Sequence, residues 1–394
     1  EYLWIILFLC TLHSVYSQNA FSQNTFDVTK YGAVGNQKTD DSRAFLKTWA
    51  TACAANAAEV TIVVPQGKTF LVNTATFQGP CKAKRLHFQV NGNVVAPSSP
   101  SSYNADSWFS FHRLNGLIIE GNGQFDGKGA MWWKRCPIVC NYRHIIFLDR
   151  TCCIYRVYVF PRSHFGLNSC SNVNITGVHI SAPASSPNTD GININYSSYI
   201  YVTDTQISVG DDCVAIQSGS SHIYITRVTC GPGHGISIGS LGVNGEKNPT
   251  VEEIHVRDSI INSATNGLRI KTWEGAGGYA RHISYYNVTV DSTYNPIIID
   301  QQYCPRNNCG NDSNKNEANA VKISDVSFTK IKGTIKGNVG VMLNCSTSVG
   351  CTGLVLKDID LKSAEGGNKI PLSMCSNAHG KVYNTQPPVT CVVP

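Results

Sequence analysis

The sequence of 394 residues has few of the features that mark nucleic-acid-binding or membrane-spanning proteins. It has no run of five or more Lys and Arg residues and no basic helix, although its formal net charge is +6. Beyond the first residues, no apolar stretch approaches the ~20 residues that a transmembrane helix needs. The positive charge suggests an acidic partner, which can be nucleic acid, anionic lipid or acidic polysaccharide. Its diffuse distribution favours an extended polyanion over a compact nucleic-acid patch, and we expect no nucleic acid and no membrane as partner.

The chain begins with an apolar run, YLWIILFLC, at residues 2–10. Val15, Tyr16 and Ser17 follow in a small-residue pattern suited to cleavage before Gln18. A membrane anchor is the alternative, but the run is too short for a bilayer core of ~30 Å. We therefore expect a signal peptide at residues 1–17 and a secreted, extracellular protein.

Cysteine content and sequons agree with export. Sixteen Cys are present, and fifteen remain without Cys10. This density predicts disulfides, with Cys345–Cys351 and Cys375–Cys391 as short-range candidates. Because the number is odd, we expect at least one thiol to be free or paired between chains. A zinc site is disfavoured, because no Cys/His pair stands at finger spacing from Cys136 and Cys140. N-glycan acceptor sequons occur at five positions: Asn174, Asn195, Asn287, Asn311 and Asn344.

One segment has the pattern of an amphipathic helix. After Asp40 and Asp41, apolar residues recur at i, i+4, i+7 and i+8, namely Phe45, Trp49, Ala52 and Cys53. We expect this helix to cap one end of the fold, where an apolar end would otherwise invite edge pairing.

The rest of the sequence consists of short β-branched strands in a repeating pair. First strands include 172–176, 199–203, 222–226 and 253–257, and second strands include 191–194, 213–216, 235–238 and 267–270. A unit of 22 to about 30 residues cannot bury its own apolar face, but stacked units can. The pattern predicts an all-β, single-domain right-handed parallel β-helix over residues 18–394. A β-propeller is the alternative, but its blades need ~40–45 residues.

Polar residues stand in register at the start of successive second strands. Asp190, Asp212 and His234 are each 22 residues apart, and Asn266 holds the same place in the next coil. Neighbouring strands lie about 4.7–4.9 Å apart, so these side chains should form a ladder on one face, with Asp211 beside it.

Alternation along the second strands places the isoleucines inward and Arg269 and Lys271 outward, on an exposed face near the acidic ladder. Crowded carboxyl groups raise one another's proton affinity, which suits an acid–base pair, and nearby cations suit an anionic sugar. Each aspartate alone would be read as a turn residue. A calcium site is the other use of clustered aspartates, but Arg269 and Lys271 would compete for the same carboxylates.

Four motifs resemble the signature of the polygalacturonases, glycoside hydrolase family 28. They are Asn188-Thr189-Asp190, Gly210-Asp211-Asp212, Gly233-His234-Gly235 and Arg269-Ile270-Lys271. The resemblance covers essentially the whole mature chain. Trp132-Trp133 and the segment 295–304 are similar to the plant branch, within which the chain most resembles the exopolygalacturonase-like enzymes of pollen, some of them allergens.

The resemblance implies a role for each residue. Asp211 would be the general acid, Asp190 and Asp212 would hold and deprotonate the attacking water, and His234 would tune the acid or bind sugar. Arg269 and Lys271 would bind a galacturonate carboxylate, with Tyr303 and Asn188 as further substrate-binding residues. The family also implies a Cys213–Cys230 bridge behind the site, and no metal or other cofactor.

The sequence thus predicts an inverting polygalacturonase that cuts α-1,4-galacturonosyl bonds of pectin (homogalacturonan), exo-acting and monomeric, in the cell wall. Endo action or a related pectic backbone are alternatives within the class. A non-catalytic wall-binding allergen is the alternative outside it, disfavoured because every expected aspartate is retained. Pectate lyases share the fold, but their chemistry needs Ca²⁺ and a basic catalyst.

Overall fold

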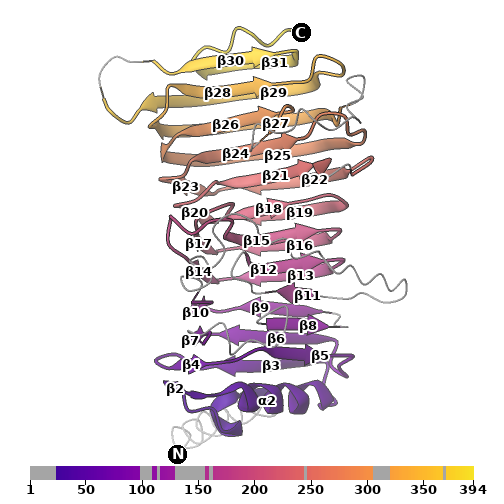
Figure 1. Ribbon diagram of the computed structural model, residues 1–394, viewed down its shortest axis with the longest axis vertical. Coiled ribbons are helices and arrows are strands. Elements are labelled where there is room, and N and C mark those ends of the chain that lie inside the picture. The colour runs from indigo at the N-terminus through magenta and orange to yellow at the C-terminus, as the bar shows by residue number, and fades with distance from the viewer. Residues whose placement is uncertain are drawn as a thin grey trace, which may run out of the picture.

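The computed structural model describes residues 24–97, 109–112, 116–128, 156–158, 163–243, 246–304, 320–366 and 370–394. In them the chain winds into a tall solenoid, with the N-terminus at one end and the C-terminus at the other (Figure 1). The predicted all-β, right-handed parallel β-helix is confirmed. The signal peptide predicted at 1–17 and the sequon at Asn311 lie outside the described residues.

Nine strands form the sheet that carries the acidic ladder, hereafter the ladder sheet. They pair in chain order and are parallel, except that the first two pair antiparallel. These strands are β11 (Arg156–Tyr158), β12 (Ser163–Asn168), β15 (Asp190–Asn195), β18 (Val214–Ile216), β21 (Ile236–Leu241), β24 (Asn266–Thr272), β26 (Asn295–Asp300), β28 (Val339–Asn344) and β30 (Leu372–Ser376).

A larger sheet of twenty strands completes the coils, and a pair, β5 (Ala75–Gln78) and β8 (Phe109–His112), stands beside it. The strands of the larger sheet are β1 (Thr25–Asp27), β2 (Asn36–Asp40), β3 (Glu59–Val64), β4 (Thr69–Leu71), β6 (Arg85–Val90), β7 (Asn93–Val95), β9 (Leu117–Glu120), β10 (Gln124–Asp126), β13 (Ser171–Thr176), β14 (His179–Ser181), β16 (Ser198–Thr203), β17 (Gln206–Ser208), β19 (Ser220–Thr226), β20 (Thr229–Cys230), β22 (Thr250–Arg257), β23 (Ile260–Asn262), β25 (Tyr279–Thr293), β27 (Lys322–Ile335), β29 (Cys351–Ser363) and β31 (Ala378–Gln386).

Aliphatic ladders inside the solenoid hold the coils in register. Ile192 pairs with Val214, which pairs with Ile236. The same row continues on the next two coils with Leu268 and Ile297. All five side chains are buried. Because a strand alternates its side chains between two faces, a slip by one residue would expose this whole set. The register that stacks the ladders therefore also fixes the outward-facing residues.

The predicted capping helix is α2 (Ser42–Ala54), which lies across the N-terminal end of the solenoid (Figure 1). Phe45, Trp49 and Ala52 of this helix are buried, as the periodicity predicted, whereas Cys53 is half-buried. A short 3-10 helix, η1 (Val28–Tyr31), precedes it. Within the described residues, no helix is long and apolar enough to cross a membrane.

Disulfides join neighbouring segments of the coils. The predicted Cys345–Cys351 and Cys375–Cys391 bridges are present, as is the Cys213–Cys230 bridge that the family resemblance implies. A fourth, Cys53–Cys81, ties α2 to the segment before β6 and was not foreseen from the sequence.

Candidate active site

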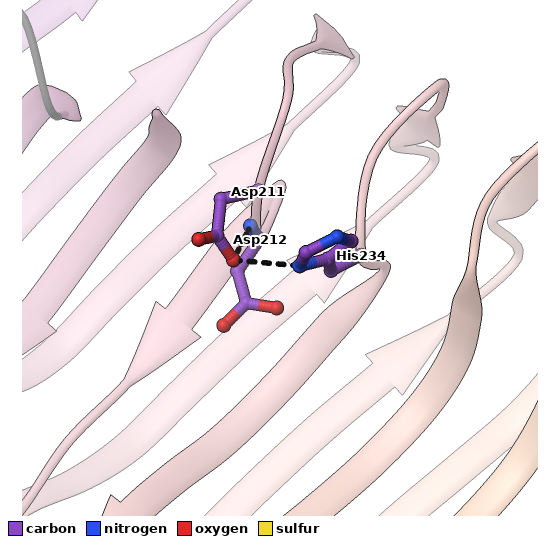
Figure 2. A group of neighbouring side chains, drawn as sticks. All are labelled: Asp211, Asp212 and His234. Atoms are coloured by element: carbon purple, nitrogen blue, oxygen red, sulfur yellow. Dashed lines mark hydrogen bonds and ion pairs between the residues drawn. The ribbon is translucent and has the colours of Figure 1, made fainter. Parts of the chain in front are cut away.

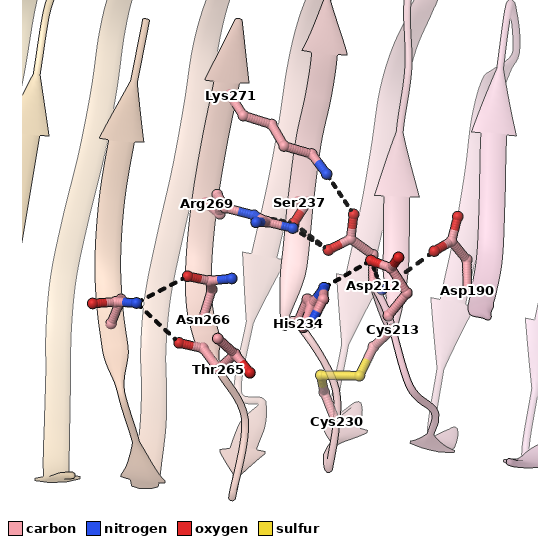
Figure 3. Close-up of polar contacts among 12 residues, drawn as sticks. Asp190, Asp212, Cys213, Cys230, His234, Ser237, Thr265, Asn266, Arg269 and Lys271 are labelled. Carbon is pink, nitrogen blue, oxygen red and sulfur yellow. Dashed lines mark hydrogen bonds and ion pairs between the residues drawn. A yellow bond between two sulfur atoms is a disulfide. The ribbon is translucent and has the colours of Figure 1, made fainter. Parts of the chain in front are cut away.

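The ladder predicted at 22-residue spacing forms at the start of three successive strands of the ladder sheet. Asp190 begins β15, Asp211 and Asp212 precede β18, and His234 precedes β21 (Figure 3). The coils approach closely here because Gly235 has a φ of 79°. A Cβ atom at Gly235 would lie 2.1 Å from the carbonyl oxygen of Gly267, so this turn admits only glycine.

Two of the carboxylates converge on one backbone amide. The N–H of Asp212 donates to Oδ1 of Asp211 at 2.9 Å and faces Oδ1 of Asp190 at 3.3 Å. Since both oxygens lie at these distances from a single nitrogen atom, they are no more than about 6.2 Å from each other. The carboxyl groups of Asp190 and Asp211 are therefore close neighbours.

The third carboxylate, Asp212, is the centre of a buried ionic network (Figure 3). Its Oδ1 accepts from Arg269 Nη2 at 2.5 Å, and its Oδ2 accepts from Lys271 Nζ at 2.9 Å. The two cations are 6% and 7% exposed and Asp212 is 2% exposed. The expectation that Arg269 and Lys271 share an exposed face is therefore wrong. They lie on the outward side of β24, but their side chains turn back over β21 to reach Asp212.

Three residues that the sequence reasoning missed contact the aspartates or their cationic partners. Ser237 Oγ donates to Asp212 Oδ1 at 2.8 Å and accepts from Arg269 Nε at 2.9 Å. Asn193 Nδ2 donates to Asp190 Oδ2 at 3.1 Å, and the Nδ1 of buried His164 lies 3.1 Å from the Asp190 carbonyl oxygen. Strand register could have found Ser237, because it pairs with Arg269 one coil on.

The environment moves the pKa values of two neighbouring aspartates in opposite directions. Burial raises the pKa of Asp190 well above its usual value, and the charges of Asp212 and Asp211 raise it further. Burial would also raise the pKa of Asp212, but Arg269 and Lys271 outweigh it and the pKa is lowered. The two neighbouring carboxyl groups therefore differ in proton affinity.

Asp190→Asn is expected to stabilise the fold at neutral pH. The pKa of Asp190 is higher in the folded than in the unfolded state. Its contribution to the free energy of unfolding is therefore fully present at pH values below the unfolded-state pKa, and it is lost as the pH rises through the folded-state pKa. The neutral amide of the variant does not suffer this loss of stability. The gain in stability over the wild type should therefore vanish below about pH 4, where Asp190 is protonated in both the folded and the unfolded state. Urea unfolding at several pH values measures it.

Asp204→Asn is the matched control for this prediction. Asp204 is paired with Arg227 on the outer surface, and its pKa is lowered by that hydrogen bond. This variant should lose a little stability at neutral pH. If Asp190→Asn behaved in the same way, the raised pKa of Asp190 would be refuted.

His234 stands on the open side of the cluster, with its Nδ1 2.8 Å from Asp211 Oδ1 (Figure 2). Ligand atoms of Asp211, Asp212 and His234 all lie within 4.8 Å of one another, so this group has the dimensions of a cation site. Both oxygens of Asp212, however, already accept from Arg269, Ser237 and Lys271. A cation here would have to displace a buried ionic network.

The remaining predicted residues differ in their proximity to the cluster. The ring centroid of Tyr303 lies 5.3 Å from Lys271 Nζ and 6.0 Å from the guanidinium carbon of Arg269, so it covers the cation pair. Asn188 is exposed, with a φ of 50°, and its side chain makes no hydrogen bond to the described part of the cluster. The disulfide between Cys213 and Cys230 joins the coils that carry Asp212 and His234 (Figure 3).

Comparison with known sequences agrees with this geometry. Residues 53–386 match the family model of glycosyl hydrolases family 28. The chain is 40% identical over 380 residues to a "probable polygalacturonase" of Arabidopsis thaliana, covering 94% of this chain and 81% of that protein. It is 36% identical to an exopolygalacturonase of Zea mays, covering 99% and 97%.

Solved structures share the fold at lower sequence identity. An exopolygalacturonase from Thermotoga maritima superposes with a TM-score of 0.61 at 16% identity, over 86% of this chain and 88% of that one. A polygalacturonase from Erwinia carotovora superposes with a TM-score of 0.60 at 18% identity, over 92% and 96%.

Proposed function

The chain belongs to glycosyl hydrolases family 28, and from this premise we propose that it is a polygalacturonase that hydrolyses α-1,4-galacturonosyl bonds of pectin. The observation that carries the proposal is the convergence of Asp190 and Asp211 on the Asp212 amide, beside a buried Arg269–Asp212–Lys271 network. Inverting glycoside hydrolysis needs one carboxyl group as the acid and a second one as the base for a water molecule.

In the proposed mechanism Asp211 is the general acid. It is the more open carboxylate, and its contact with His234 lies toward solvent. Asp211 would donate its proton to the leaving glycosidic oxygen while Asp190 takes a proton from the attacking water. Asp212, held ionised by two cations, would orient the water and stabilise the positive charge of the transition state.

Arg269, Lys271 and Tyr303 are proposed to bind the galacturonate carboxylate and ring. Arg269 uses Nε and Nη2 within the network, and Lys271 uses one contact, so each keeps N–H donors for substrate. Asn188, exposed at the turn before Asp190, is proposed as a further sugar contact. No cofactor enters this scheme.

The finer parts of the proposal rest on the relatives. Exopolygalacturonases of maize and Platanus acerifolia match at 36% and 35% identity over almost their whole length, which favours exo action. We further propose a signal peptide at 1–17, a single β-helix domain from 18 to 394, secretion to the cell wall as a monomer, and N-glycans among the five sequons.

The test is digestion of polygalacturonate with and without a chelator. Hydrolysis predicts a rise in reducing ends, no ultraviolet-absorbing unsaturated product, and the same rate in chelator. Exo action predicts that viscosity stays high while monogalacturonate appears. An unsaturated product would refute hydrolysis. An early collapse of viscosity would refute exo action alone.

A further inference from the structure

The outward face of the ladder sheet continues past the active site onto β26, β28 and β30. In register, Lys271 is followed by Asp300, then Asn344, then Ser376. The parallel row begins at Arg269 and continues with three apolar side chains: Ile298, Met342 and Met374. Neighbouring strands lie about 4.7–4.9 Å apart, so the character of this face changes from cationic to apolar and acidic within one coil.

Asp300 presents a fixed negative charge on this face. Its Oδ1 accepts from the backbone N–H of Gln302 at 3.0 Å and from Asn344 Nδ2 at 3.1 Å. In the part of the chain that the structure describes, its Oδ2 has no hydrogen bond and Asp300 has no ion pair. An ionised carboxylate whose hydrogen-bond donors are neutral repels an anion placed next to it.

Within these three strands, the rest of the face offers no cation to an anionic sugar. The strands β26, β28 and β30 contain no Lys, Arg or His. The apolar row becomes more open along the axis, from 8% exposure at Ile298 to 53% at Met374. Outward-facing apolar side chains in a row beside a binding site are more often functional than scattered ones.

We propose that this face binds a neutral, methyl-esterified galacturonate unit, and that Asp300 is the residue that selects against an ionised one. The inference rests on the proposed polygalacturonase function and deepens it. An ionised carboxylate one coil beyond Lys271 would meet the charge of Asp300. A methyl ester removes that repulsion and places an apolar group beside Met342, which is half-buried. The preferred substrate is therefore partly methyl-esterified pectin, with an ionised unit at Arg269 and Lys271 and an esterified unit beyond.

The test compares kcat/KM on polygalacturonate and on partly methyl-esterified pectin made from the same polymer. Asp300→Asn keeps the Oδ1 acceptor and removes the charge. It should raise the ratio of kcat/KM for polygalacturonate over pectin at least about fourfold, the value expected for two unit charges about 5 Å apart in water. Asp325→Asn, the same change at a 59% exposed position on β27 of the other sheet, should leave the ratio unchanged.

A second variant keeps the test decisive if Asp300→Asn does not fold. Met342→Lys places a cation in the apolar row and should raise the same ratio. An unchanged ratio in both folded variants, with the wild type active on polygalacturonate, would overturn this inference and leave the proposed function intact. A wild type that cuts neither polymer would instead overturn the proposed function itself.

Discussion

Asp211→Asn is expected to lower kcat on polygalacturonate by about 10²–10⁴-fold while leaving the fold unchanged. The amide is similar in shape to the carboxyl group but cannot deliver a proton to the leaving oxygen. The hydrogen bond from the Asp212 N–H can still be accepted by the amide oxygen, so the turn before β18 should persist. Steady-state kinetics with far-ultraviolet circular dichroism measure both outcomes.

The same variant distinguishes the acid from the base. A leaving group that needs no protonation, such as a nitrophenolate, should restore much of the chemical rate to Asp211→Asn but not to Asp190→Asn. Asp360→Asn, at a 55% exposed site paired with Lys362, is the control for a harmless Asp-to-Asn change. If this leaving group instead restored the rate of Asp190→Asn, Asp190 would be the acid and Asp211 the base.

Arg269→Met is expected to destabilise the protein by about 3–5 kcal/mol at neutral pH, the usual cost of removing one partner of a buried ion pair. Asp212 is 2% exposed and would keep only Lys271 as a cationic partner. The matched control is Arg227→Met, which breaks a surface pair with Asp204 whose side chains are 57% and 49% exposed, and should leave the stability almost unchanged.

The pH dependence gives this prediction a sign. The pKa of Asp212 is lower in the folded than in the unfolded state. Its ionic contribution to the free energy of unfolding is therefore present at pH values above the unfolded-state pKa, and it is lost as the pH falls through the folded-state pKa. The difference between wild type and Arg269→Met should therefore shrink in acid. Urea unfolding at neutral and acidic pH measures it. A difference that is small at neutral pH, or that grows in acid, would contradict the network.

The sequence predicted the fold because its repeat and its alternation specify the same register. A 22-residue step places Asp190, Asp212 and His234 in one row only if the two coils between them each add 22 residues, as these two coils do. Alternation also sorted Ile270 inward and Arg269 outward. It could not tell how deeply an outward side chain would be covered, so the burial of Arg269 and Lys271 was missed.

The electrostatics of the site depended on contacts across several coils. Asp190 and Asp212 look equivalent in the repeat, yet only Asp212 reaches the two cations on β24. Side-chain length and direction decide which carboxylate Lys271 Nζ meets, and the spacing of residues along the chain does not contain that information. The opposite pKa shifts of the two aspartates follow from this choice.

The measurement that tests the central claim most directly is the configuration of the first product at its new reducing end. Proton NMR can follow the digestion of polygalacturonate before the product mutarotates. Single displacement by a water molecule, activated by Asp190 and opposed by the acid Asp211, predicts that the α-linked substrate first yields the β anomer. An α anomer as the first product would indicate two displacements through a covalent intermediate, and would contradict the roles assigned to these aspartates.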